Sequence, residues 1–339
     1  MCVDNSEGGT GDRPQIRDVA AAAGVSYQTV SRVLNNSPRV RPETRRLVLD
    51  AMDRLRYRPN RAAQTLGSGR ANAVTVITAN TTLYGYAAVL QGVEEAGRQL
   101  GLAVGVRVVE SEAAADVRQA VDHLSDPSAG SVVVVAFDPA GAAVVRALPA
   151  GVPVVAATEA GGLPDVARPM LFLDERQAAA EATRHLLELG HRTVHHVAIP
   201  SEARASARQS GWREALSGVD AEIPPVVAAG WDVASAYRAV RELVADPAVT
   251  AILCGNDDTA LAVRRALYEA GRDVPGEVSI VGFDDVPGAA FWTPALTTVR
   301  MDFLGLGRAC VNRLVDAPVI EPEVPHLVIR ESTAAPSSR

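Results

Sequence analysis

The chain has 339 residues, of which 47% are hydrophobic, so it is long enough to form two or three domains with substantial cores. It contains no run of about 20 apolar residues and residues 1–13 are polar, so we expect no membrane span, no secretion signal and a cytoplasmic location. Its cysteines, Cys2, Cys254 and Cys310, are far apart in sequence. This spacing predicts neither a disulfide framework nor a metal site.

The net charge of −7 is unevenly distributed along the chain. Residues 13–70 contain 12 arginines and four acidic residues, a net charge of +8, whereas the rest of the chain is strongly acidic. Such asymmetry is typical of a nucleic-acid-binding segment attached to an acidic body, because phosphate contacts require positive charge.

Three short helices are predicted in this basic segment. The first is indicated by apolar residues at helical spacing, namely Ile16, Val19, Ala20 and Ala23. Gly24 ends it, and Ser26 caps a second helix over 27–34 whose Val30 and Val33 point inward. A third helix begins near Pro42. The residues expected on its inner side are Leu47, Ala51, Met52 and Leu55.

Two helices joined by a short glycine-containing turn form a helix-turn-helix, whose second helix enters the major groove of DNA. Gln28 can bond adenine, Arg32 can bond guanine, and Tyr27 can contact a thymine methyl or a base edge. Side chains better placed for phosphates are Ser31, Asn35, Arg41, Thr44 and Tyr57. A surface helical bundle with solvated arginines is the alternative that this spacing leaves open.

The stretch from Ile16 to Leu66 contains the motifs D-V-A, A-G-V-S, T-V-S-R-V-L-N and Y-x-P-N-x-x-A, in order and without gaps. It resembles the headpiece of the lactose-repressor/galactose-repressor (LacI/GalR) family of transcriptional regulators, and Ser26-Tyr27-Gln28 with Arg32 is most similar to the lactose-repressor branch. The resemblance implies a disordered leader over 1–13 and a DNA-binding headpiece over 14–58. It also adds Ile16 and Ser26 to the expected DNA contacts.

A hinge and linker are predicted over residues 59–70, where a short helix-capable stretch ends at glycines. A helix so short is expected to fold only against a partner copy or DNA. In the family, this helix pairs with its copy from a second subunit in the minor groove. The resemblance therefore implies DNA contacts for Asn60 and Ala63 and an intercalating role for Leu66, whose alternative is a contact with the next domain.

Residues 71–339 alternate apolar runs with helix-length segments, which is typical of doubly wound α/β sheets. The runs expected to form strands are 73–78, 102–109, 131–137, 152–157, 170–173, 193–199, 251–254 and 278–283. Their number favours two sheets. Ligands of such folds bind beyond the carboxyl ends of strands or between two such domains.

The family resemblance continues through this body, in LELGHRTVHHVAIP, R-x-x-G-W, CGNDDTALA, V-P-x-x-V-S-I-V-G-F-D-D, LTTVRMD and R-E-S-T. It implies a periplasmic-binding-protein-like body of two α/β subdomains that binds an effector and dimerises. The implied effector contacts are Arg208, Asn256 and Asp284, with Tyr84, Phe172 and Trp231 as aromatic surface. Such a set suits the hydroxyls and the ring of a sugar.

Two positions depart from the family's sugar-binding pattern. Thr158, which we keep as an expected effector contact, is a neutral hydroxyl where several relatives have an aspartate, and Ala79 replaces a serine. The identity of the effector therefore stays open. Asp257 and Asp285 have the simpler interpretation of capping helices or bonding backbone.

An enzyme is the first alternative for the body, but no G-x-G-x-x-G or P-loop motif follows a predicted strand, so we expect no cofactor. His191, His195 and His196 lie around a strand start without the spacing of a helical metal site, so we expect no metal. A periplasmic solute-binding protein is the second alternative, but it would need an export signal and no basic helix-turn-helix.

We therefore expect a homodimeric repressor of carbohydrate uptake or catabolism genes, released from a pseudo-palindromic operator by a sugar or glycoside. Effector binding would rotate one subdomain against the other and melt the paired hinge helices. A non-sugar effector or a corepressor is the alternative that the sequence leaves open.

Overall fold

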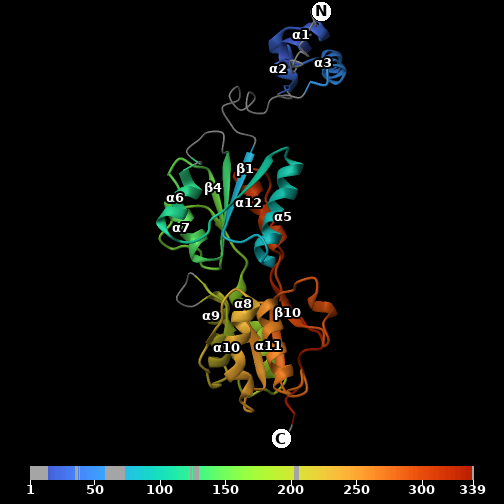
Figure 1. Cartoon of the computed structure of the whole chain (residues 1–339). Coiled ribbons are helices and arrows are strands. Elements are labelled where there is room, and N and C mark those ends of the chain that lie inside the picture. The colour runs from blue at the N-terminus through green and yellow to red at the C-terminus, as the bar shows by residue number, and fades with distance from the viewer. Residues whose placement is uncertain are drawn as a thin grey trace, which may run out of the picture. The chain divides into compact units, whose positions relative to one another are not determined.

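The structure, a computed structural model, describes residues 14–34, 37, 39–57, 73–122, 124, 130–201 and 206–337 (Figure 1). The chain separates into two units, Met1–Ala71 and Asn72–Arg339. The predicted leader and hinge, with Asn35, Asn60, Ala63 and Leu66, lie outside the described residues.

The described part of the first unit forms three helices, α1 (Ile16–Ala23), α2 (Tyr27–Leu34) and α3 (Pro42–Arg54). Gly24 ends α1 with a φ of 65°, a left-handed conformation that favours glycine. The Ser26 hydroxyl then accepts the backbone N–H of Thr29 at 3.2 Å in the first turn of α2. The predicted helix-turn-helix is therefore confirmed, with both ends of α2 at the expected residues.

A small core joins the three helices. Its fully or nearly fully buried side chains are Val19, Ala20, Val30, Val33, Val48 and Ala51. The prediction for one position of α3 was wrong, since Leu47 is 53% exposed and Val48 is buried in its place. The inner face of α3 therefore starts one residue later than expected and continues through Ala51 at helical spacing.

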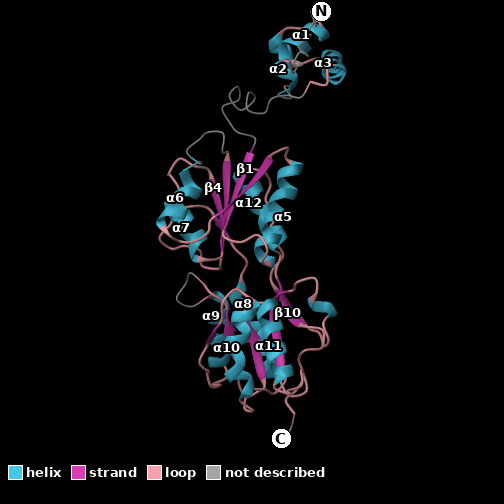
Figure 2. Ribbon diagram, in the orientation of Figure 1, coloured by secondary structure: helices cyan, strands magenta, loops and turns pink. Residues whose placement is uncertain are grey.

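The second unit contains two sheets, each flanked by helices (Figure 2). The first has five parallel strands in the order β2-β1-β3-β4-β5, and we call it and its helices the N-subdomain. Its elements are β1 (Ala73–Thr78), α5 (Tyr84–Gln99), β2 (Ala103–Val108), α6 (Ala114–Asp122), β3 (Ser131–Ala136), α7 (Pro139–Ala147), β4 (Val154–Thr158), β5 (Met170–Leu171) and α12 (Phe303–Leu314).

The second sheet has six strands in the order β11-β10-β9-β8-β6-β7, and we call it and its helices the C-subdomain. Only the pair of β10 and β11 is antiparallel. Its elements are α8 (Glu175–Glu188), β6 (His195–Ala198), α9 (Ala207–Ser217), β7 (Val227–Ala228), α10 (Val233–Ala245), β8 (Ala251–Cys254), α11 (Asp257–Glu269), β9 (Ser279–Asp284), a 3-10 helix (Ala289–Phe291), β10 (Thr297–Arg300) and β11 (His326–Val328). The fold therefore confirms the prediction of two α/β sheets.

The chain passes between the two subdomains three times. The connections are 172–174 before α8, 301–302 between β10 and α12, and 315–325 between α12 and β11. After the second connection, α12 packs closely across α5. A Cβ on Gly92 would lie 2.1 Å from the Leu304 carbonyl oxygen, and a Cβ on Gly307 would lie 2.2 Å from the Val89 carbonyl oxygen. Figure 1 shows α12 beside α5, next to the N-subdomain sheet.

Candidate DNA-reading helix and effector pocket

The outer face of α2 carries the side chains predicted to read bases. Tyr27 is 54% exposed, and Gln28 and Arg32 are exposed as well, whereas Val30 and Val33 face the core. Ser31 is half-buried between the two faces. The helix therefore presents an amide and a guanidinium in an arrangement that fits hydrogen bonding to base edges.

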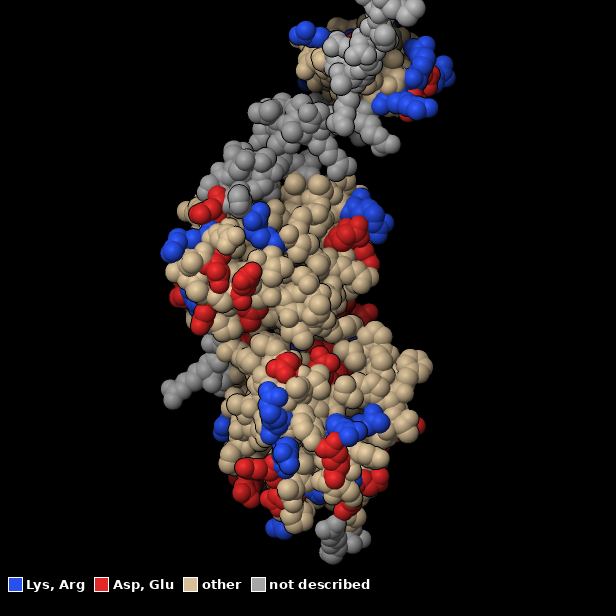
Figure 3. Space-filling model, viewed as in Figure 1, with Lys and Arg blue, Asp and Glu red and all other residues tan. Residues whose placement is uncertain are grey.

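The other predicted DNA contacts are distributed around this helix. Arg41 is exposed and directly precedes α3, Thr44 is half-buried in its first turn, and Ser26 is exposed. Ile16 and Tyr57 are half-buried against the headpiece core. Burial, followed by the proximity of Tyr27, raises the pKa of Tyr57. Basic side chains outnumber acidic ones on the visible face of this unit, and the body shows both charges (Figure 3).

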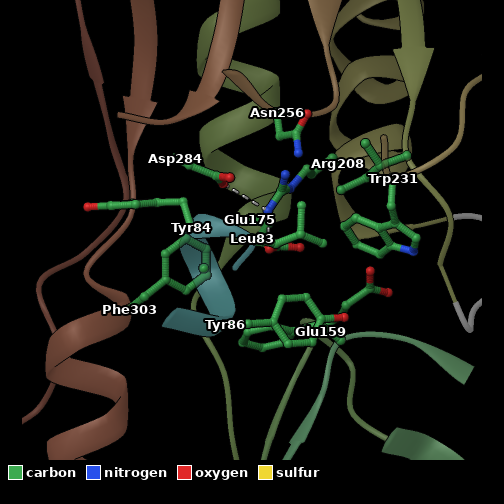
Figure 4. A pocket seen from close by; sticks show the side chains of 13 residues that line it. Leu83, Tyr84, Tyr86, Glu159, Glu175, Arg208, Trp231, Asn256, Asp284 and Phe303 are labelled. Carbon is green, nitrogen blue, oxygen red and sulfur yellow. Dashed lines mark hydrogen bonds and ion pairs between the residues drawn. The ribbon is translucent and has the colours of Figure 1, made fainter. Parts of the chain in front are cut away.

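A pocket of about 440 Å³, including its open mouth, lies between the two subdomains of the body. Its lining consists of residues at strand ends and helix starts, namely Leu83, Tyr84, Gly85, Tyr86, Phe137, Glu159, Glu175, Ile199, Arg208, Trp231, Asn256, Asp284 and Phe303. Figure 4 shows Arg208 between Asp284 and Trp231, with Tyr86 and Glu159 on the opposite wall. Five of the seven predicted effector contacts therefore line one cavity.

Arg208 is held in the pocket by the crossing of α9 with α8. Gly211 makes this crossing close, because a Cβ there would lie 2.0 Å from the Arg176 carbonyl oxygen. The Arg208 guanidinium then donates to Glu175 at 2.8 Å and to the Gly255 carbonyl, and it lies 4.4 Å from the centroid of the Phe283 ring. Burial alone would lower the pKa of Arg208, but the nearby carboxylates raise it.

Asp284 is the second charged group that faces Arg208, at 3.5 Å. Its backbone φ is 106°, an uncommon conformation for a residue with a side chain. Its Oδ1 atom is buried and has no hydrogen-bond partner among the described residues. Burial raises the pKa of Asp284 well above its usual range, and Arg208 opposes this shift. This oxygen is therefore an acceptor that a ligand hydroxyl can satisfy.

Asn256 caps α11 and contributes an amide to the pocket. Its Oδ1 accepts the backbone N–H of Thr259 at 2.8 Å and the Thr259 hydroxyl at 2.7 Å. The oxygen is thus used locally, and the amide N–H₂ group is the part of this side chain that can serve a ligand. The neighbouring Asp257 bonds the Val286 N–H and the Thr298 hydroxyl, which confirms the simpler interpretation of this residue.

Aromatic side chains from both subdomains form the apolar part of the lining. Tyr86 lies edge-on to Trp231 with ring centroids 6.1 Å apart, and edge-on to Phe137 at 5.4 Å. Its hydroxyl donates to Asp138 at 2.5 Å, and burial together with this carboxylate raises the pKa of Tyr86. Tyr84 lies edge-on to Phe303. Such surfaces suit the apolar faces of a sugar ring.

Two predicted effector contacts are absent from this lining. Thr158 is buried at the end of β4, and its hydroxyl has no hydrogen-bond partner among the described residues. Phe172 is 49% exposed, because β5 ends at Leu171 and the chain then leaves the N-subdomain. Neither residue contacts the cavity in this structure, and Glu159, the neighbour of Thr158, lines it instead.

Two lining carboxylates, Glu175 and Glu159, were not named among the predicted effector contacts. Glu175 gave no signal, because it is one of several charged residues at the start of α8. Glu159 belongs to a stretch without regular structure, and it accepts a hydrogen bond from Ser201, which follows β6, at 2.5 Å. The available signal for Glu159 was its position two residues after the predicted strand 152–157.

Two of the three neighbouring histidines, His191 and His196, have different hydrogen-bond partners. His191 lies 3.0 Å from Thr250, Ser279 and the Ala334 carbonyl, whereas His196 bonds the Leu253 carbonyl. In the described part of the chain, no group of three or more His, Cys, Asp or Glu side chains is arranged to hold a metal ion. Likewise, none of the described helices is long and apolar enough to cross a membrane.

Comparisons with known proteins give matches in both units of the chain. The profile "Bacterial regulatory proteins, lacI family" matches residues 15–60, and "Periplasmic binding protein-like domain" matches residues 183–333. The lactose operon repressor of Escherichia coli (strain K12) is 32% identical over 303 residues, covering 88% of this chain and 83% of that protein. The regulator CelR of Thermobifida fusca is 33% identical over 340 residues, covering 94% and 98%.

Solved structures give the same result. The Lac repressor dimer bound to operator and the anti-inducer ONPF matches with a TM-score of 0.82 and 29% identity, over 96% of this chain and 100% of that one. The CelR–cellobiose complex matches with a TM-score of 0.68 and 30% identity, over 94% and 100%. The helix-turn-helix, the two-subdomain body and these relatives together show that the chain belongs to the LacI family and is a DNA-binding transcriptional regulator.

Proposed function

We propose that this regulator is a repressor that binds a pseudo-palindromic operator as a homodimer and releases it when a sugar or glycoside enters the pocket. The observation that carries the proposal is the pocket itself. It combines a buried guanidinium, a carboxylate oxygen without a described hydrogen-bond partner and an amide N–H₂ group with aromatic walls, and both subdomains contribute to it. A ligand that bonds both walls will favour one relative position of the subdomains.

A sugar is the effector class that this lining fits best. Sugars present many hydroxyls, which can donate to Asp284 and Glu159 and accept from Asn256, and their rings have apolar faces for Trp231 and Tyr86. The relatives support this assignment, since one matching structure is a complex of CelR with cellobiose. The genes that such a regulator controls would serve carbohydrate uptake or catabolism.

For the DNA interface, we propose that Tyr27, Gln28 and Arg32 read bases while Ser26, Ser31, Arg41 and Thr44 position the backbone. The exposed outer face of α2 supports this division of roles. The headpiece over 14–58, the hinge over 59–70 and the minor-groove role of Leu66 stay part of the proposal. The Lac repressor, a relative, is crystallised as a dimer on its operator.

Each subdomain exposes apolar side chains that fit a second copy of the chain. On the C-subdomain, Tyr268 of α11 is 75% exposed and Phe291 of the 3-10 helix is 86% exposed. On the N-subdomain, Val106 and Val108 of β2, a strand at the sheet edge, are 48% and 52% exposed. Contacts through both subdomains would let a rotation within each body change the separation of the two headpieces.

We further propose that the chain is not an enzyme and works in the cytoplasm, where its DNA target lies. The named relatives are regulators, which supports this proposal.

The proposed function is tested by selecting operators from random duplexes with the purified full-length chain and then adding single sugars and glycosides in a gel-shift assay. We expect a palindromic preference and the release of DNA by at least one compound. A typical allosteric coupling of about 1–3 kcal/mol corresponds to roughly 5- to 150-fold weaker binding. No preference for any palindrome would refute the regulator model, and tighter binding with a compound would identify a corepressor instead.

A further inference from the structure

Arg208 is the only basic side chain among the described residues that line the pocket, and its charge is already paired. Glu175 accepts a hydrogen bond from it at 2.8 Å, and both side chains are more than nine-tenths buried. The Gly255 carbonyl accepts a second hydrogen bond, and the Phe283 ring covers one face of the guanidinium. Arg208 therefore does not present a free positive charge to a ligand.

The other charged residues of the described lining are acidic. Glu159 and Asp284 face the cavity in addition to Glu175, so three carboxylates accompany one guanidinium. Even when Asp284 is counted as protonated, negative groups outnumber positive ones. A phosphate or carboxylate placed in this cavity would lie beside like charges in a buried site, where their repulsion is weakly screened.

We propose that Glu175 sets the charge selectivity of the effector pocket, so that uncharged, hydroxyl-rich ligands bind and phosphate- or carboxylate-bearing ones are rejected. This inference rests on the proposed function in taking the pocket as the effector site. Glu175 acts by accepting a hydrogen bond from the guanidinium of Arg208, which would otherwise be able to form bidentate hydrogen bonds with an anion. It is therefore a specificity-determining residue that works through its neighbour.

The geometry assigns this role to Glu175 rather than to Asp284. Glu175 forms a hydrogen-bonded ion pair with Arg208, whereas Asp284 lies 3.5 Å away and its Oδ1 makes no hydrogen bond with the described residues. The Asp284 oxygen stays available for a ligand hydroxyl. Glu175 is also the first residue of α8, and the α8–α9 crossing at Gly211 fixes it against Arg208. The pair is thus built into the fold before any ligand arrives.

The experiment compares Glu175→Gln with the unmodified protein, using inorganic phosphate as the probe. Trp231 lines the pocket, so binding is followed by its fluorescence and by the shift of the thermal midpoint of the full-length chain. Removal of the carboxylate leaves Arg208 without its hydrogen-bonded ion-pair partner and with only the longer pair to Asp284. We expect phosphate to bind Glu175→Gln about ten- to a hundredfold more tightly than the unmodified protein, the range expected for a charged hydrogen bond.

Glu214→Gln is the matched control, because it removes a carboxylate from the same pair of helices. Glu214 of α9 pairs with Arg176 of α8 at 2.8 Å, but this pair is exposed and outside the pocket. It should leave phosphate binding unchanged. Glu175→Asp keeps the charge and should also gain no phosphate affinity. Retained operator binding shows that each variant is folded, and Arg208→Gln in the Glu175→Gln background should abolish the gain.

Two results would overturn the inference. One is equal phosphate affinity in Glu175→Gln and Glu214→Gln, and the other is an unmodified protein that binds sugar 6-phosphates at least as tightly as the matching neutral sugars. The test of the role of Glu175 can be distinguished from the test of the proposed function. If no neutral sugar binds while Glu175→Gln still gains phosphate, the sugar assignment fails and the role of Glu175 stands.

Discussion

Asp284 and Asp285 are adjacent in sequence, but their carboxylates serve different parts of the body. Asp284 lies 3.5 Å from Arg208 in the pocket, whereas Asp285 binds Arg300 at 2.6 Å and Arg330 at 2.7 Å. Both aspartates have positive φ, at 106° and 53°. Arg300 directly precedes one connection between the subdomains, and Arg330 follows another. We therefore expect a movement of Asp284 to reach these two ion pairs through one peptide unit.

Asp285→Asn should weaken these pairs. The Asp285 side chain is 5% exposed, so its loss leaves two arginines without a buried partner. We expect the free energy of unfolding to fall by about 2–4 kcal/mol in urea denaturation. Asp165→Asn is the control, because Asp165 pairs with Arg146 at 2.8 Å on the surface, and the loss of this exposed pair should destabilise the protein much less. Equal losses in the two variants would contradict a special role for Asp285.

Arg32→Ala should reduce operator affinity at one position of each half-site. The exposed guanidinium of Arg32 lies on the outer face of α2, where it can bond a guanine, and such a contact is worth about 1–3 kcal/mol. The measurement is a gel-shift assay on a set of operators with single base changes. Arg46→Ala on α3, where the side chain is also exposed, should not alter base preference. Uniform weakening on all operators by Arg32→Ala would refute base reading.

Arg208→Ala should separate the two activities of the protein. It leaves the carboxylates of Glu175 and Asp284 unpaired in the pocket, so effector response should be lost while the headpiece still binds DNA. We also expect the body to lose about 3–5 kcal/mol of stability, the usual cost of breaking a buried ion pair. Arg213→Ala, an exposed position on the same helix, should retain induction. Normal induction in Arg208→Ala would exclude Arg208 from the site.

Gly211→Ala tests the helix crossing that places Arg208. The new Cβ would lie 2.0 Å from the Arg176 carbonyl oxygen, which is backbone and cannot turn aside, so α9 must shift. We expect a loss of about 2 kcal/mol in the free energy of unfolding and weaker effector binding. Gly218→Ala at the end of the same helix meets its nearest atom at 3.4 Å and should be nearly neutral. Unchanged effector affinity in Gly211→Ala would show that the crossing does not position Arg208.

His196 should make the body less stable in acid. Its Nδ1–H donates to the Leu253 carbonyl at 3.0 Å, and its Nε2 is buried without a described partner, so burial lowers the pKa of His196 to about 4. The unfolded chain, with a pKa near 6.5, binds a proton first as the pH falls. The contribution of His196 to the free energy of unfolding should therefore be fully present above about pH 6.5. It should decline as the pH falls toward 4, by at most about 3 kcal/mol.

His196→Gln removes this titration and should flatten the pH dependence of the free energy of unfolding, measured by urea denaturation between about pH 4 and 7. His326→Gln, at an exposed position, should leave the curve unchanged. His185, His191 and His195 also have pKa values lowered by burial, so part of the slope should persist. A slope identical to that of the unmodified protein would contradict the role of His196.

Local sequence signals were sufficient where an element carries its own pattern. The runs 73–78 and 251–254 coincide with β1 and β8. The first is rich in β-branched residues, and the second is a continuous apolar stretch between Thr250 and Gly255. The short strands β7, β10 and β11 have two to four residues and no comparable periodicity. They form because neighbouring strands supply hydrogen-bond partners, which sequence patterns do not reveal.

For the pocket, positions that follow strands were predictable and positions fixed by packing were not. Asn256 and Asp284 stand where β8 and β9 end, so their polar side chains were recognisable. Glu175 reaches the pocket only because Gly211 allows α8 and α9 to cross closely, a relationship between residues far apart in sequence. The same reasoning applies to Leu47 and Val48, where a small rotation of α3 decides which residue is buried.

The threefold passage of the chain between the subdomains has a consequence for engineering. Neither half of the body corresponds to a continuous stretch of gene, because α12 is encoded after most of the C-subdomain yet packs in the N-subdomain. No single cut therefore releases a self-contained half. A chimera that exchanges one half with a relative needs three matched splice points, at 172–174, 301–302 and 315–325. A hybrid chain spliced at only one of them would build at least one subdomain from segments of both parents.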